Sequence, residues 1–380
     1  MAHPVDPSIT HHPAYNTLDR DDFGSMLSLA RYAERTSDFD HIISATVDHF
    51  WDPNDPRYID FADAQYDFDT TNETLMPRDF CIELQCAVAD KLDEGQQIRL
   101  ANENTRFQLS SILHGEQGAL SLSASLAMIL RDPGAQEYAT NQAREEARHV
   151  AGFSNYIAKR WGTPLESGPT LKNLMCEVVT TQKVYKKLIG MQMLIEGLAM
   201  GAFATINANT NDPLLQRLIQ FTMTDEAFHH KFGKIWADKT VPKLSPEEHE
   251  VVEDWAAECF QHLLFNLINA EQKQAIYGEF GLDWEWVRSA VIEAFSDEDR
   301  RASMTESTDI FRVLIKTLLK AGIITDRTRH IYAQWVDMNE LNREDAEVVG
   351  TDVAEEAMDV LRDINRGRKK IGKALRSVEL

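Results

Sequence analysis

Two short stretches of this sequence each place a glutamate and a histidine three residues apart. The pairs are Glu146 with His149 and Glu226 with His229. On a helix, residues i and i+3 lie on one face about a turn apart, so each pair can offer a carboxylate and an imidazole to the same metal ion. A single Glu-x-x-His is common on solvated surface helices, so one copy alone predicts little.

A further glutamate precedes each pair at the same distance. The interval along the chain from Glu116 to Glu146 equals the interval from Glu196 to Glu226. Both Glu116 and Glu196 fall on mainly apolar stripes at helical spacing, in stretches predicted to be long helices. A lone acid on a buried stripe costs several kcal/mol unless it is paired or bound to a cation, so each of these two acids requires a partner.

One constant shift along the chain relates the two halves of this pattern, which we call the internal repeat. It superposes six identical pairs of positions, which include the turn between the helices: Glu116 and Glu196, Asp132 and Asp212, Pro133 and Pro213, Glu146 and Glu226, Ala147 and Ala227, His149 and His229. Such a repeat is expected of two helix hairpins packed about an approximate twofold axis. The packing would bring four carboxylates and two imidazoles into the bundle interior, where the carboxylates repel one another unless cations are bound. Two divalent cations would neutralise them, and mixed oxygen and nitrogen donors favour iron or manganese over calcium.

The elements that would position these residues are almost all helical, so the predicted fold class is all-α. Long helices are predicted at about 96–131, 133–161, 178–208 and 213–238, and no stretch alternates convincingly as a strand. Shorter helices are predicted on both sides, at 78–90 and, after Pro242, at 246–277, 284–295, 304–321, 327–339 and 343–373. We divide the chain into an N-terminal extension with packing helices (1–95), a core of four helices (96–240) and C-terminal helices of the same domain (241–380).

Composition and charge limit the partners. The chain of 380 residues has a formal net charge of −22, which opposes nucleic acids and anionic membrane surfaces. No export signal is visible, the longest apolar-leaning run (118–130) is too short and too serine-rich to span a bilayer, and the four cysteines lack metal-site spacing. A cytoplasmic protein is therefore expected.

One basic run departs from the acidic character of the chain: Arg362, Arg366, Arg368, Lys369, Lys370, Lys373 and Arg376. It could dock on an acidic surface, although such runs are more often solvated helix ends.

At these residues the sequence resembles the ferritin-like di-metal carboxylate superfamily, whose core helices supply Glu, Glu-x-x-His, Glu and Glu-x-x-His in that order. The match covers roughly residues 96–240. The resemblance implies a four-helix bundle core and two iron ions, with manganese as the alternative. It implies these ligands: Glu116, Glu146, His149, Glu196, Glu226 and His229.

The resemblance also implies roles for neighbouring residues. Glu146 and Glu226 would bridge the two metals. The acid before each motif, Glu145 or Asp225, would accept a hydrogen bond from a metal-bound histidine, and Arg148 could hold that acid in place. Glu145 departs from the more usual aspartate by one methylene group.

Within the superfamily, several activities are open. The ribonucleotide reductase small subunit carries a radical tyrosine four residues after the first histidine, where this chain has Phe153, and Tyr156 is more simply a core aromatic. Arylamine N-oxygenases carry an additional histidine where this chain has Thr222. Ferritins are much shorter, and acyl-carrier desaturases, which remain an alternative, would be expected to present a basic surface.

The expectation is therefore a dioxygen-dependent di-iron oxygenase that hydroxylates or N-oxygenates a small organic metabolite. A radical-generating subunit or a desaturase-like oxidase is the alternative. The expected partners are dioxygen, the substrate and an electron donor or reductase, and a homodimer is left open. His114 and His230 point to other helix faces. The candidate pocket residues, each of which is more simply explained as ordinary core, are Leu120, Gln192, Ala199, Met200 and Phe203.

Overall fold

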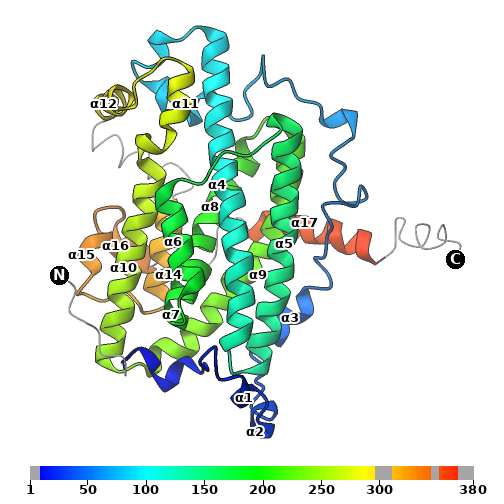
Figure 1. Ribbon diagram of the computed structural model, residues 1–380, viewed down its shortest axis with the longest axis vertical. Helices are drawn as coiled ribbons and strands as arrows, with labels where there is room; N and C mark the ends of the chain where they lie inside the picture. Colours follow the sequence, from blue (N-terminus) through cyan, green and yellow to red (C-terminus); the bar gives the residue numbers. More distant parts are fainter. Residues whose placement is uncertain (1–8, 296–309, 344–350, 367–380) are drawn as a thin grey trace, which may run out of the picture.

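The computed structural model describes residues 9–295, 310–343 and 351–366, which fold into helices and connecting loops. This part of the chain contains no β-strand, and one isolated bridge joins Thr17 to Leu130. The all-α fold class predicted from the sequence is therefore confirmed for the described residues. Long helices run along the longest axis of the molecule, and shorter segments surround them (Figure 1).

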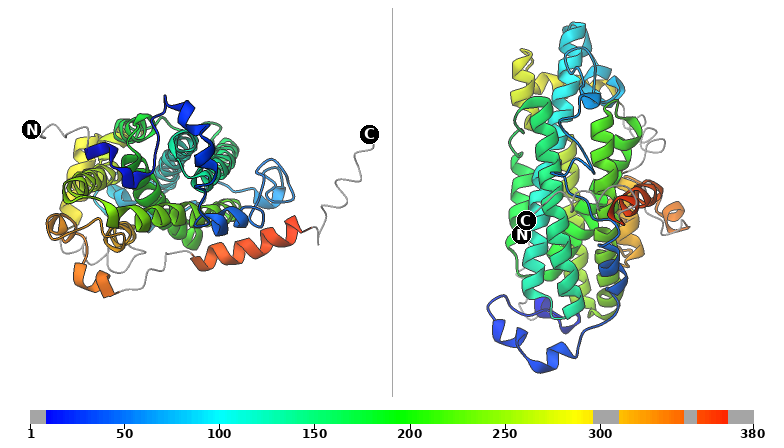
Figure 2. Two further views of the ribbon diagram at one scale, coloured as in Figure 1. Left: turned by 90° about the horizontal axis from the view of Figure 1, so that it is seen from below. Right: turned by 90° about the vertical axis from the view of Figure 1, so that its right-hand side faces the viewer.

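Two helix hairpins occupy the centre of the molecule. The first consists of α4 (Glu94–Ile129) and α5 (Pro133–Trp161). The second begins with three consecutive helical segments: α7 (Val184–Lys187), the π-helical segment η7 (Leu188–Ile195) and α8 (Glu196–Asn209). It returns through α9 (Pro213–Thr240). The second hairpin lies behind the first in the view of Figure 1 and beside it in the right-hand view of Figure 2.

Matching residues start the second helix of each hairpin. Asp132 and Asp212 are N-caps whose carboxylates accept hydrogen bonds from the backbone N–H groups of Gly134 (2.8 Å) and Leu214 (2.9 Å). A proline follows each aspartate, and its fixed φ and missing N–H suit the first position of a helix. The internal repeat thus extends to the turns that set the register of α5 and α9.

The start of the second hairpin differs from the prediction. The helix expected over 178–208 begins at Val184, because α6 (Pro169–Thr180) ends before it. Residues 188–195 are π-helical, which periodicity could not reveal, since this stretch is apolar at almost every position. Among the described residues, Val184–Asn209 is the one helical segment that is long and apolar enough to cross a membrane. The search for apolar runs in the sequence missed it. Most of this segment is buried inside the bundle.

The N-terminal segment folds into short pieces. Three of them are short α-helices: α1 (Phe23–Met26), α2 (Leu29–Tyr32) and α3 (Asp40–Ala45). The helix predicted over 78–90 is wrong, because this stretch forms separate 3₁₀ turns. The carboxylate of Glu83 accepts hydrogen bonds from Lys273 and Tyr277 in the interior, and Cys81 is buried as well. Residues two apart lie on different faces of an α-helix, so one α-helix could not bury both side chains.

The C-terminal helices pack around the bundle, and several of them contact the second hairpin. They are α10 (Pro246–Ile268), α11 (Gln274–Glu279), α12 (Trp284–Ala294), α14 (Ile310–Lys320), α15 (Arg329–Tyr332), α16 (Met338–Arg343) and α17 (Thr351–Asn365). The helices predicted at 246–277 and 327–339 are each interrupted, at Asn269 and after Tyr332. The predicted helical residues 304–309, 344–350 and 367–373, and the basic run beyond Arg366, lie outside the described residues.

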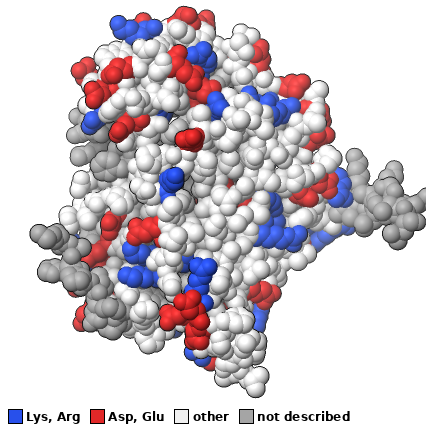
Figure 3. Space-filling view, in the orientation of Figure 1, with Lys and Arg blue, Asp and Glu red and all other residues white. Residues whose placement is uncertain are grey.

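A belt of buried acids and histidines separates two apolar clusters in the bundle. The upper core, toward the C-terminal end of α5, contains Phe153, Phe203 and Leu218, and the lower core, toward the N-terminal end of α5, contains Tyr138 and Phe232. Four helices therefore carry polar side chains at mid-height between apolar layers. On the face shown in Figure 3, basic side chains are interspersed with acidic ones.

Candidate metal centre

The six predicted metal ligands meet in the belt between the two apolar cores. Glu116 comes from α4, Glu146 and His149 from α5, Glu196 from the first position of α8, and Glu226 and His229 from α9. All six side chains are buried, and the most exposed of them, Glu116, retains 5% of its surface. The structure thus brings together a cluster that could hold metal ions.

The two central carboxylates are shared by the two histidines. Nδ1 of His149 lies 3.2 Å from Glu146 Oε2 and 3.1 Å from Glu226 Oε1. Nδ1 of His229 lies 3.0 Å from Glu146 Oε1 and 3.1 Å from Glu226 Oε2. Glu146 and Glu226 therefore each direct one oxygen to each side of the cluster.

The other two glutamates occupy the outer ends of the cluster. Glu116 Oε2 lies 3.1 Å from Nδ1 of His149, and the ligand atoms of Glu196, Glu146 and His229 lie within 4.8 Å of one another. Each half thus consists of one histidine, one glutamate of its own and the two shared carboxylates. The halves use corresponding residues of the internal repeat.

The second nitrogen of each histidine contacts the acid of the opposite motif. His149 Nε2 lies 2.8 Å from Asp225 Oδ2, and His229 Nε2 lies 2.9 Å from Glu145 Oε2. A carboxylate can only accept, so Nε2 carries the proton and Nδ1 is directed to the cluster. The two hairpins are cross-linked by these contacts, in the positions expected for Glu145 and Asp225.

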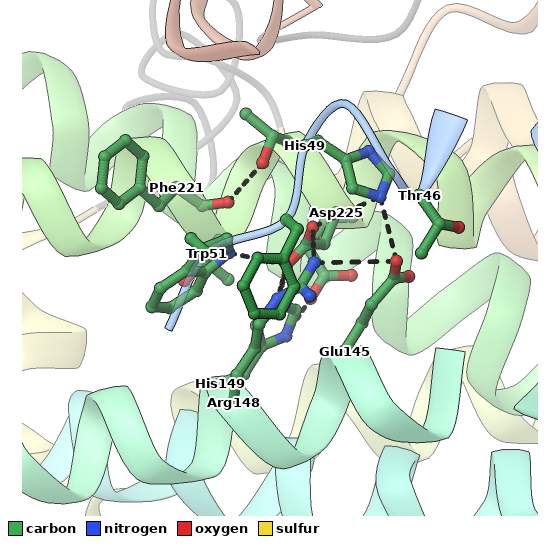
Figure 4. A network of polar contacts seen from close by, with 12 residues as sticks. Thr46, His49, Trp51, Glu145, Arg148, His149, Phe221 and Asp225 are labelled. Atoms are coloured by element: carbon green, nitrogen blue, oxygen red, sulfur yellow. Dashed lines mark hydrogen bonds and ion pairs between the residues drawn. The ribbon is translucent and has the colours of Figure 1, made fainter. Parts of the chain in front are cut away.

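Three donors converge on Asp225 from two parts of the chain (Figure 4). Arg148 donates through Nε to Asp225 Oδ2 at 2.9 Å and through its second amino group to the other oxygen. The indole N–H of Trp51 donates to Oδ2 at 2.9 Å, next to the imidazole of His149. Arg148 therefore holds Asp225, as expected from the sequence, and Trp51 is an additional contact.

His49 makes the corresponding contact to the other acid. Its Nε2 lies 2.9 Å from Glu145 Oε1 (Figure 4). Sequence reasoning missed both His49 and Trp51, because they lie in a loop that is distant in sequence from the first motif. The only available signal was a histidine and a tryptophan in a stretch that is otherwise rich in turn residues.

Gln142 is a further residue that the sequence did not reveal. Its Nε2 donates to Glu146 Oε1 at 3.0 Å and to Glu196 Oε1 at 3.2 Å, and so joins the two hairpins. It lies four residues before Glu146 on α5, on the same helix face. That spacing was the signal that could have identified it.

The electrostatics of the cluster show that it requires positive charge. Burial raises the pKa of Glu116 and Glu196 well above the ordinary value, and the carboxylate of Glu226 adds to the rise. Burial alone would lower the pKa of His149 and His229, but the surrounding carboxylates raise both well above the ordinary value. In the absence of metal ions, protons bound to these carboxyl and imidazole groups thus supply the positive charge.

The donor set fits two divalent cations. Four carboxylates carry four negative charges, which two such ions balance, and the neutral imidazoles add one nitrogen donor on each side. Among the described residues, Glu146 Oε2 and Glu226 Oε1 lie 3.2 and 3.1 Å from Nδ1 of His149 but form no well-directed hydrogen bond, as expected of oxygens that could bind a metal. The cluster is therefore compatible with a di-metal carboxylate site.

The predicted pocket residues are distributed unevenly. Met200 and Phe203 are fully buried in the upper core, whereas Leu120 and Ala199 are only half-buried. Gln192 is fully buried in η7, one turn before Glu196, and its amide group has no hydrogen-bond partner in the described part of the chain.

Three further residues lie where the sequence placed them, outside the cluster. Tyr156 is buried in the upper core and donates to Asp212 at 2.6 Å. His114 lies 2.8 Å from the carbonyl oxygen of Leu165. Burial lowers the pKa of His230 to about 4, so this histidine is uncharged in the interior.

Comparisons of the chain with models of known protein families and with curated proteins gave no match.

Proposed function

We propose that the chain is a ferritin-like di-metal carboxylate protein whose four-helix core is formed by α4, α5, α8 and α9. It would hold two iron ions, or manganese ions in their place, through Glu116, Glu146, His149, Glu196, Glu226 and His229. The observation that carries the proposal is the shared position of Glu146 and Glu226, each with one oxygen beside His149 and the other beside His229. Carboxylates placed in this way can bridge two cations, one beside each imidazole.

The activity that best fits such a centre is a dioxygen-dependent oxygenase acting on a small organic metabolite. A ferrous pair supplies the electrons that reduce dioxygen and an oxidised centre able to attack a strong bond. A separate reductase or a soluble reductant would restore the ferrous state.

The chain's own residues would orient this centre and limit access of water to it. Asp225 and Glu145 keep the proton on Nε2 of the histidines. Phe153, Met200 and Phe203 are fully buried in the upper core and would exclude water from that side of the cluster.

A radical-generating subunit is a second candidate, favoured by one observation. Trp51, Asp225 and His149 form a continuous hydrogen-bonded series from an indole to a proposed ligand, and such a series could carry an electron. Against it, Phe153 occupies the position of the expected radical tyrosine, and Tyr156 is bonded to Asp212 in the upper core. Electron paramagnetic resonance distinguishes the two, because a stable tyrosyl signal without substrate supports the second candidate.

Metal analysis and dioxygen uptake test the leading proposal. Protein purified from iron-replete cells should contain about two metal ions per chain, and its ferrous form should consume dioxygen. Glu116→Ala should abolish that consumption, while the melting temperature of the metal-free variant stays close to that of the metal-free wild type, because the buried acid does not stabilise the metal-free fold. The matched control is Glu137→Ala, which changes an exposed glutamate of α5 and should consume dioxygen normally. The absence of metal from iron-replete preparations would refute the proposal.

A further inference from the structure

The cluster has different surroundings on its two sides along the bundle axis. On the lower side, four fully buried polar side chains have unpartnered atoms among the residues that the structure describes. They come from α4, α5 and η7: Ser123 Oγ, Tyr138 OH, Gln142 Oε1 and both amide atoms of Gln192. We call these four residues the polar layer. Native interiors rarely leave such atoms unpaired, so the concentration of four of them requires a reason.

The helix directions place all four on the same side. Ser123 follows Glu116 by seven residues on α4, and Tyr138 and Gln142 precede Glu146 by eight and four residues on the antiparallel α5. The ring of Tyr138 lies 4.9 Å from that of Phe232, which follows the ligands on α9.

Gln192 lies on the same side of the cluster, one turn before Glu196, and so corresponds in height to Gln142 rather than to Ser123 and Tyr138. A Cβ atom added at Gly233 of α9 would lie 2.8 Å from the Cβ of Gln192, so η7 and α9 approach closely there. Gly233 follows His229 by four residues, which again places the contact below the cluster.

The internal repeat is broken at every one of these positions. The shift that superposes the six proposed ligands places Phe203, Leu218, Thr222 and Ile112 opposite Ser123, Tyr138, Gln142 and Gln192. Phe203 and Leu218 are apolar and fully buried, and Ile112 packs against the same upper core. The hydroxyl of Thr222 is already bonded to the carbonyl oxygen of Leu218 at 3.1 Å. One side of the cluster thus presents unpartnered polar groups where the corresponding positions on the other side present three apolar side chains and a threonine whose hydroxyl is already bonded.

The chemistry of the polar layer specifies an uncharged partner. The Nε2 of Gln142 donates to Glu146 and Glu196, so its Oε1 faces away from the carboxylates as a fixed acceptor. Gln192 offers a donor and an acceptor, and the hydroxyls of Ser123 and Tyr138 can serve as either.

No buried cation of these helical turns is free for an anion. The buried ammonium group of Lys187 is bonded to Ser125 and to two backbone carbonyls at the end of α6. Arg144, Lys231 and Lys234 are exposed. An anionic substrate would therefore enter without a counter-charge from the protein, beside a centre whose two cations are already balanced by four carboxylates.

We propose that the polar layer is the substrate-binding wall of the cluster and that it takes a small uncharged molecule carrying both a hydrogen-bond donor and an acceptor, such as a carboxamide. The inference rests on the proposed function, because it assigns the substrate class of the same centre. It disfavours long hydrocarbon chains and carboxylates. The donor of the substrate would meet Gln142 Oε1, one turn from Glu146, and its acceptor would meet Gln192 or Tyr138.

Benzamide tests this assignment, with benzoate and toluene as charged and apolar molecules of similar size. The full-length protein is loaded with manganese(II), and proton relaxation of each probe is compared with that in zinc-loaded protein. Benzamide protons should relax faster with the manganese protein, and benzoate and toluene protons should not. Gln192→Leu should weaken benzamide binding about tenfold, equivalent to the loss of one buried hydrogen bond, without loss of metal. Tyr138→Phe provides a second variant, and Thr222→Val on the opposite side should bind benzamide like the wild type.

Three results would each overturn the inference. Gln192→Leu could bind benzamide as tightly as the wild type, the protons of all three probes could relax equally, or manganese-loaded protein could leave the relaxation of benzamide protons unchanged. Elemental analysis of the same samples separates this failure from that of the proposed function. If no metal binds, the proposed function fails; benzamide should then still raise the melting temperature of the wild type, and raise it more than that of Gln192→Leu. Absence of that difference would show that only water fills the polar layer.

Discussion

Asparagine in place of Asp225 changes a fully buried carboxylate that accepts hydrogen bonds from three side chains. The side chain accepts hydrogen bonds from His149 Nε2 at 2.8 Å, from Trp51 Nε1 at 2.9 Å and from two nitrogens of Arg148. Asparagine keeps the shape but removes the charge and turns one acceptor into a donor. It therefore leaves the buried guanidinium of Arg148 without its main counter-charge.

The expected loss of stability follows from this geometry. Breaking a buried ion pair from one side costs about 3–5 kcal/mol, because the remaining charge stays desolvated. Arg148 also lies 3.6 Å from Glu145, which retains part of the attraction, so a value near 3 kcal/mol, about the lower end of that range, is expected. The altered acceptor beside His149 should also weaken metal binding by about 10–100-fold.

Urea denaturation of the metal-free protein measures the first effect, and competition with a chelator measures the second. The matched control is Asp238→Asn on the same helix, where an exposed aspartate pairs with Lys234 and about 0.5 kcal/mol or less is expected. The reasoning is refuted if Asp225→Asn costs no more than Asp238→Asn, or if its metal affinity is unchanged.

Three further predictions concern packing, titration and metal removal. Gly152→Ala places a methyl group 2.8 Å from Leu218 Cδ1 and should cost about 1–3 kcal/mol in urea denaturation, whereas Gly115→Ala, which meets nothing within 4 Å, should be neutral or stabilising. Burial lowers the pKa of Lys187 to about 8, so between pH 8 and the ordinary lysine range the unfolded chain binds a proton that the folded chain has lost. The free energy of unfolding of the wild type should therefore rise with pH in that window relative to that of Lys187→Met, which has no group that titrates at this position. Parallel plots of unfolding free energy against pH for the two proteins would contradict this prediction. Removal of metal by a chelator should lower the melting temperature in calorimetry, and an unchanged value would show that metal does not bind the native state preferentially.

The helices that carry the cluster could be predicted from the sequence because two hairpins repeat the same signals. Asp132 and Asp212 cap α5 and α9, and the spacing from Glu116 to Glu146 recurs in the second half. These equal intervals predicted which side chains lie close together, and the burial and clustering of the six residues agree with that prediction. Their role as ligands stays a prediction.

The remaining contacts depend on tertiary packing that local patterns do not encode. His49 and Trp51 reach the cluster from a loop without helical periodicity. The π-helical segment before Glu196 has no period to detect, because nearly every residue in it is apolar. Glu83 is drawn inward by Lys273, which is far away in the sequence, and this contact breaks a helix that composition alone favoured.

The central claim is that Glu146 and Glu226 bridge two metal ions. The most direct measurement is a crystal structure of the iron-loaded protein with anomalous scattering recorded at the iron edge. We predict two iron peaks about 3.5–4 Å apart, each beside one of His149 and His229, with one oxygen of Glu146 and one of Glu226 bound to each. A single peak, or two peaks that share neither carboxylate, would contradict the account.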